Sequence, residues 1–107
     1  MPKIKIDLNK DVLDFENGET KPLVMRNADG SSAGVATMRS QLANMLKYSR
    51  TGDAVKYLGW VIDLGQTGVL EVDEADYQHL VEFVNKNDMT SRLVAGQILR
   101  EMQRGKG

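Results

Sequence analysis

The chain has 107 residues, of which 41% are hydrophobic and 27% are charged. This length suits a single domain with one modest core, and the composition excludes a disordered or a membrane class for the chain as a whole. Its 14 basic and 15 acidic residues give a formal net charge of −1, which removes the overall attraction that non-specific nucleic-acid binders use.

Cysteine is absent, so the chain has no disulfide framework, no thiolate nucleophile and no cysteine metal site, and a reducing compartment suits it. Apolar runs are only a few residues long, and the opening residues alternate apolar with charged side chains. We therefore expect neither a signal peptide nor a membrane span, and we expect a cytoplasmic protein.

The first quarter of the chain has the pattern of strands. Apolar and charged residues alternate over residues 3–8, which is typical of a half-buried strand. Asn17-Gly18 tolerates the positive φ angles of a tight hairpin turn, and Leu23 to Met25 is predicted to return as a strand. Pro22 lacks a backbone donor, so the returning strand should begin there or lie at an edge.

Residues 26–34 are rich in Asn, Asp, Gly and Ser, and we expect a loop whose Ser31 or Ser32 caps a helix. That first helix should carry Val35 on its apolar face and end near Thr51-Gly52. Its other apolar positions are Met38, Leu42, Met45 and Leu46.

Three more helices are predicted further along the chain. Asp53 should cap the second, which ends at Gly65, and a short extended piece over residues 69–72 should follow it. Asp73 should cap the third, with Asp76 three residues on, as an acidic variant of the capping box. Thr90 or Ser91 should open the fourth.

The fourth helix has two weak points. Gly96 lies inside it and lowers its helix propensity. The end of the chain, Gly105-Lys106-Gly107, is expected to fray.

The expected fold is α+β, with an N-terminal β-hairpin or small antiparallel sheet packed on a bundle of about four helices. Residues 1–107 should form a single domain, with strands and hairpin in 1–25 and helices in 35–104. The residues expected in the core recur on apolar helical stripes: Leu42, Leu46, Leu58, Ile62, Leu80, Val84, Leu93 and Ile98.

The stretch from Asp63 to Glu74 partly fits a calcium-loop template, with Asp63 at position 1, Gly68 at position 6 and Glu74 at position 12. However, Gly65 stands at position 3 and offers no side-chain oxygen, and the chain has no partner loop. We therefore favour a structural role, in which the glycines end one helix and the acidic residues cap the next. We expect no bound metal or other cofactor.

No catalytic set can be assembled from the sequence. His79 is the only histidine, and we expect it on a solvated helix flank. Asp73 and Asp76 stand at a helix start, where carboxylates offset exposed amides more often than they act as acid and base. No strand is followed by a complete phosphate-cradling glycine loop. We expect no enzyme and no catalytic residue.

Charge is unevenly distributed along the chain. Between Ser31 and Gly52 the charged residues are Arg39, Lys47 and Arg50, with no acid. The C-terminal stretch contains four basic residues, Arg92, Arg100, Arg104 and Lys106, against one acid, Glu101. The acidic run contains Asp63, Glu71, Asp73, Glu74 and Asp76. A surface polarised in this way suits protein contacts or self-assembly as readily as nucleic acid. Trp60 and the methionines could also mark a partner face, although Met38 and Met45 lie at core spacing.

Several segments resemble small accessory proteins of tailed phages and prophages. They are the opening strand and hairpin, Met38-Arg39-Ser40-Gln41-Leu42, the step from Gly68 through Val69-Leu70-Glu71-Val72-Asp73 to Glu74, and Val94-Ala95-Gly96-Gln97-Ile98-Leu99. The resemblance implies a viral or prophage origin and a small accessory role.

The function expected from these observations is that of a non-enzymatic protein-binding accessory factor. The alternative is a nucleic-acid-binding protein that uses the basic helical segments, whose binding would weaken steeply with salt. The oligomeric state stays open.

Overall fold

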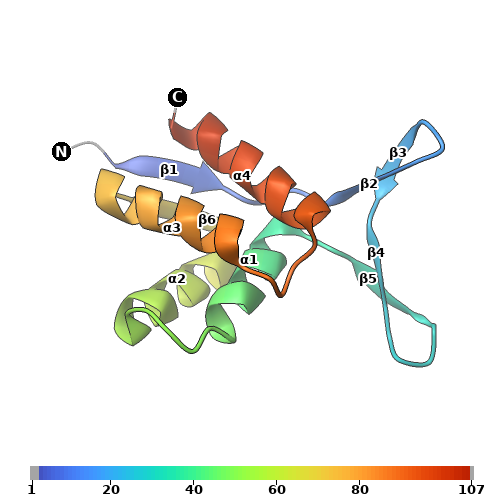
Figure 1. The fold of residues 1–107 in the computed structure, drawn as a ribbon, viewed down its shortest axis with the longest axis horizontal. Helices are drawn as coiled ribbons and strands as arrows, with labels where there is room; N and C mark the ends of the chain where they lie inside the picture. Colours follow the sequence, from blue (N-terminus) through green and yellow to red (C-terminus); the bar gives the residue numbers. More distant parts are fainter. Residues whose placement is uncertain (1–2, 107) are drawn as a thin grey trace.

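A computed structural model describes residues 3–106 and confirms the α+β class (Figure 1). The strands are β1 (Ile4–Asp7), β2 (Leu13–Glu16), β3 (Glu19–Pro22), β4 (Val24–Arg26), β5 (Ser32–Val35) and β6 (Val69–Val72). The helices are α1 (Met38–Lys47), α2 (Ala54–Gln66), α3 (Glu74–Lys86) and α4 (Arg92–Lys106).

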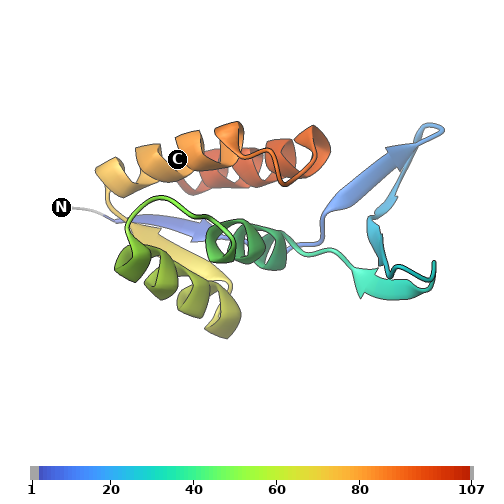
Figure 2. The ribbon, with the colours of Figure 1, turned by 60° about the horizontal axis from the view of Figure 1, so that its bottom comes forward.

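The centre of the body is a two-stranded antiparallel sheet in which β1 pairs with β6, with Ile6 opposite Leu70. Figure 2 shows this sheet between two layers of helices, with α3 and α4 on one side and α1 and α2 on the other. Ile6, Leu70 and Val72 are buried between the layers. The alternation predicted over residues 3–8 is thus confirmed.

Local capping explains where the helices begin. Asp53 accepts a hydrogen bond from the Lys56 N–H at 3.0 Å, and Asp73 accepts one from the Asp76 N–H at 2.8 Å. Such caps satisfy amides that the first helical turn leaves unpaired. The predictions that Asp53 and Asp73 cap the second and third helices are confirmed.

The segment between the first hairpin turn and α1 differs from the prediction. Asn17 and Gly18 do form a turn with positive φ, but the strand that returns is β3. Pro22 ends this strand instead of beginning it, although it does lie in an edge strand, as the alternative prediction had it. The strand predicted at Leu23 to Met25 is present as β4, but it pairs with β5 in a second hairpin. The expected loop at 26–34 therefore contains a strand.

Polar side chains build the turn of this second hairpin. The Asn27 N–H donates to the Ser31 carbonyl at 2.8 Å, and both the N–H and the hydroxyl of Ser31 donate to Asp29. Ser31 and Ser32 are thus used in the hairpin and cap no helix. Thr37 caps α1 instead, so Val35 lies in β5 and not on the first helix.

Five of the eight predicted core residues are buried: Leu42, Leu46, Leu80, Val84 and Ile98. The prediction is wrong for Leu58, Ile62 and Leu93, which are exposed. On α2 a competing stripe that includes two aromatic side chains faces inward, made by Tyr57, Trp60 and Leu64. Aromatic rings bury more apolar area than a leucine, which favours that orientation of the helix.

The last helix runs through Lys106, so the expected fraying at Gly105 and Lys106 is wrong, whereas Gly107 lies outside the described residues. A Cβ atom built on Gly105 would lie only 2.3 Å from the Lys5 carbonyl oxygen. Glycine is therefore what lets α4 approach the backbone of β1 so closely.

Candidate interaction surfaces

The two hairpins, residues 13–35, form an arm that projects from the helical body (Figures 1 and 2). We call these residues the arm. The expected N-terminal hairpin is therefore present, but it extends away from the helices. The structure places most of the arm in water, because all residues from Phe15 to Pro22 and from Val24 to Val35 are exposed.

Backbone hydrogen bonds hold the base of the arm. The Val12 N–H donates to the Ala36 carbonyl at 2.8 Å, the Leu23 N–H to the Val12 carbonyl at 2.8 Å, and the Ala36 N–H to the Leu23 carbonyl at 2.9 Å. Gln97 of α4 adds a clamp, since its side chain accepts from the Leu13 N–H and donates to the Leu13 carbonyl, both at 2.8 Å. The arm thus leaves the body from a fixed point.

Large apolar side chains on the arm are about half exposed. Phe15 is 57% exposed, and Val24, Met25 and Val35 are 41–44% exposed. Val24 is directly opposite Val35 in the second hairpin. Single exposed apolar residues are ordinary, but a group of them on a projecting element is a feature of interaction sites.

Acidic residues outnumber basic ones on the arm. Its carboxylates are Asp14, Glu16, Glu19 and Asp29, against Lys21 and Arg26, so its formal charge is −2. Lys21 and Glu16 form an exposed ion pair at 2.9 Å, and the hydrogen bond from Lys21 lowers the pKa of Glu16.

A groove lies between α1 and α2, with a volume of about 300 Å³. Its lining residues are Leu46, Lys47, Ser49, Arg50, Thr51, Gly52, Ala54, Tyr57, Leu58 and Val61, and we call them the α1–α2 groove. Lys47 and Arg50 bring two positive charges and no carboxylate is among the lining residues. Asp53, which lies next to the groove in sequence, accepts the capping hydrogen bond of α2.

A second hollow, of about 480 Å³, reaches α3 and shares five lining residues with this groove: Ser49, Arg50, Thr51, Gly52 and Tyr57. The Tyr57 hydroxyl lies 2.7 Å from His79 Nε2, and burial raises the pKa of Tyr57, helped by the charge of Asp53. His79 is exposed on α3, as expected, yet it is tied to Tyr57 and tilted against Trp60 rather than only solvated. This contact holds the Tyr57 hydroxyl against α3.

Trp60 does not offer a partner face, because it is buried and stacks on Tyr57 with ring centroids 5.6 Å apart. Met38 and Met45 are buried, which confirms the packing interpretation. The methionines that remain accessible include Met25 on the arm and Met89 before α4.

The calcium-loop residues lie in two helices and in the loop before β6. Asp63 lies in α2, Gly68 precedes β6, and Glu74 begins α3, where its Oε1 atom is 2.7 Å from Lys106 Nζ. Within residues 3–106, no group of three or more His, Asp or Glu side chains is placed to hold a metal ion.

Many of the basic side chains identified in the sequence have partners within the chain. Arg39 donates to Asn9 Oδ1 at 2.8 Å, and Arg92 donates to the carbonyls of Asn85 and Asn87 at the end of α3. Arg104 lies 2.8 Å from Glu101, which Lys10 also contacts at 3.0 Å. The contacts of Arg39, Arg92 and Lys10 link separate segments of the body, and the Arg104–Glu101 pair lies within α4.

No protein-family model, curated protein or solved structure matches the chain. The resemblance to small phage and prophage proteins therefore stays a prediction. In the part of the chain that the structure describes, no helix is both long enough and apolar enough to cross a membrane.

The arm and the α1–α2 groove were not identified from the sequence as interaction surfaces. The signal for the arm was present in Phe15, which lies between Asp14 and Glu16, and in Val24-Met25, which precedes Arg26. No local sequence pattern indicated the groove, because its lining depends on which apolar stripe of α2 faces inward.

Proposed function

We propose that the chain is a non-enzymatic protein-binding accessory factor that contacts its partner through the arm. The observation that carries the proposal is that Phe15, Val24, Met25 and Val35 are each more than 40% exposed on a projecting element with a fixed base. An isolated two-stranded hairpin is marginally stable in water, so two such hairpins gain from a surface that covers them. Their unpaired strand edges would gain in the same way.

A pull-down with a matched control tests this proposal. The tagged chain is incubated with a lysate of the cells that carry it, and bound proteins are identified by mass spectrometry. Phe15→Ser on the arm should remove the specific partner. Met89→Ser, at a residue that is 56% exposed outside the arm, should retain it.

Both substitutions are at exposed positions, so circular dichroism should show unchanged folding for each variant. Recovery of no specific partner, or equal recovery by both variants, would contradict binding through the arm.

Nucleic-acid binding is the second candidate, and it is favoured by Lys47 and Arg50 in a groove lined by no carboxylate. It is less well supported than protein binding, because Arg39, Arg92 and Arg104 are engaged within the chain. A gel-shift titration with DNA and RNA at low salt distinguishes the two. Nucleic-acid binding predicts a shift that weakens steeply with salt and is lost in a Lys47→Gln, Arg50→Gln double variant.

A further inference from the structure

The chain has a larger solvent-accessible surface area than is usual for a compact monomer of its mass. The solvent-accessible surface is 6894 Å². A compact monomer of 11.9 kDa is expected to expose about 5,950 Å². The radius of gyration is 14.1 Å, against about 13 Å for a compact chain of this length. The excess of about 900 Å² is close to the roughly 800 Å² that one partner contributes to a stable interface.

The arm and the α1–α2 groove are complementary in charge. The arm carries −2, while Lys47 and Arg50 in the groove carry +2 with no carboxylate in the lining. Opposite charges on facing surfaces steer association and fix its register. Two arms facing each other would instead bring like charges together.

The two surfaces also match in apolar character. The arm offers Phe15 and Met25, and the groove has Ala54, Leu58 and Val61 along its α2 wall. Leu58 is 59% exposed, and Val55 and Ile62 lie exposed on the same helix. Aromatic and methionine side chains are common anchors in the core of an interface, so the arm suits a groove with an aliphatic wall.

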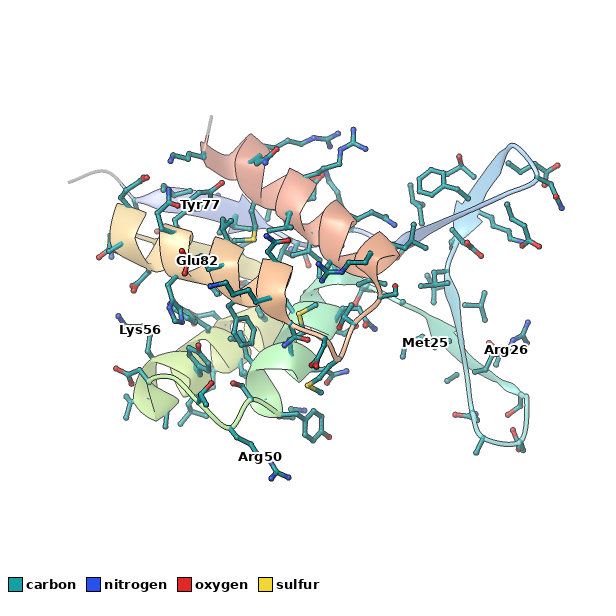
Figure 3. The ribbon with its side chains drawn as sticks, in the orientation of Figure 1. Met25, Arg26, Arg50, Lys56, Tyr77 and Glu82 are labelled. Carbon is teal, nitrogen blue, oxygen red and sulfur yellow. The ribbon has the colours of Figure 1, made fainter. Side chains whose placement is uncertain are left out.

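The arm cannot reach the groove of its own chain. Figure 3 shows Met25 and Arg26 on the arm, and Arg50 far from them on the loop between α1 and α2. Gln97 and the hydrogen bonds at the base of the arm hold it in that direction. A contact between arm and groove must therefore join two copies.

We infer that the partner of the arm is a second copy of this chain, which receives the arm in its α1–α2 groove. This inference rests on the proposed function, because it names the partner of the same surface. Two copies that exchange arms form a closed two-fold dimer, whereas copies that give the arm to one neighbour and the groove to another make a head-to-tail contact. Such heterologous contacts form a ring if the rotation closes and a filament if it does not.

Light scattering coupled to size exclusion tests the contact directly. The wild-type chain should have a mass above 11.9 kDa that grows with concentration and falls with added salt. Phe15→Asp removes the arm contact and Leu58→Asp removes the groove contact, and each variant alone should be monomeric. Both residues are exposed, so circular dichroism should show both variants folded.

Mixing the two variants is the decisive measurement. The Leu58→Asp copy keeps a working arm and the Phe15→Asp copy keeps a working groove, so the mixture should form a 1:1 complex of twice the monomer mass. An arm-to-arm contact predicts the opposite, because Leu58→Asp alone would dimerise and mixing would form no new complex.

The outcomes also separate this inference from the proposed function. Suppose that the wild-type chain is monomeric at every concentration and that the pull-down recovers an arm-dependent partner of another sequence. This result would overturn the contact between two copies and would agree with the proposed function. A monomeric chain with no arm-dependent partner overturns both.

Discussion

Two leucines on neighbouring helices offer a direct test of the fold. Leu80 on α3 is fully buried, whereas Leu58 on α2 is 59% exposed, although the sequence pattern predicts both in the core. Changing Leu80 to Ala should lower the free energy of unfolding by about 2–5 kcal/mol, because it removes buried methyl groups and leaves a cavity. Changing Leu58 to Ala should alter it by no more than about 0.5 kcal/mol.

The expected shifts in melting temperature follow from the size of the chain. With an unfolding entropy of about 2.1 cal/mol/K per residue, the loss at Leu80 corresponds to roughly 9–22 °C. The loss at Leu58 corresponds to about 2 °C or less. Both are measured by far-UV circular dichroism, with urea unfolding followed by the fluorescence of the buried Trp60.

The measurement must be made at low protein concentration, because self-association would add stability to the wild type and Leu58→Ala would reduce it. Since the whole domain is stable by only about 5–15 kcal/mol, Leu80→Ala could leave little folded protein. Val84→Ala, at a residue that is also fully buried, then serves as the milder variant. Equal losses at Leu58 and Leu80 would mean that the orientation of α2 is wrong.

Three further predictions concern α4, pH and calcium. Gly96→Ala should stabilise the chain by up to about 1 kcal/mol, because a Cβ atom there meets nothing within 4 Å. Gly105→Ala should destabilise the chain, because its Cβ atom would contact the β1 backbone. Thermal unfolding of the two variants compares these effects. The hydrogen bond from Lys106 lowers the pKa of Glu74 from its ordinary value of 4.5. The pairing therefore stabilises the fold at pH values above 4.5, and this stability is lost as the pH falls through the lowered pKa. Glu74→Gln should flatten this part of the pH–stability curve. Calcium should leave the melting temperature unchanged, and a rise that Glu74→Gln abolishes would establish an ion site in residues 63–74.

Features set by neighbours in sequence were predictable. Asp53 and Asp73 cap helices because a carboxylate three residues before an unpaired amide reaches it without help from the rest of the fold. Asn17 and Gly18 make a turn because both adopt positive φ. These local rules gave the α+β class and most helix boundaries.

The second hairpin could not be read from composition. Residues 26–34 have the polar character of a loop, yet Asn27, Asp29 and Ser31 use that character to close a turn. The direction of the arm was also inaccessible, because Gln97 holds Leu13 from 84 positions along the chain. A bond between such distant residues leaves no local pattern.

The orientation of α2 was ambiguous because the helix is apolar on two sides. Leu58 and Ile62 form one stripe, and Tyr57, Trp60 and Leu64 form the other. Periodicity alone fits either stripe. The packing of the aromatic rings against α3, where Tyr57 meets both His79 and Phe83, decides between them.

Two errors of sequence reasoning fall on the two surfaces proposed to interact. Leu58 and Val35 were both assigned to an apolar helical face, and both are exposed, one in the α1–α2 groove and the other on the arm. A chain that worked alone would gain solubility from polar residues at these positions, since apolar side chains there favour aggregation. Departures from local rules are expected where a sequence serves a function besides folding. Because the two surfaces also have opposite charge, contact between them would cover the apolar side chains that the folded body does not bury.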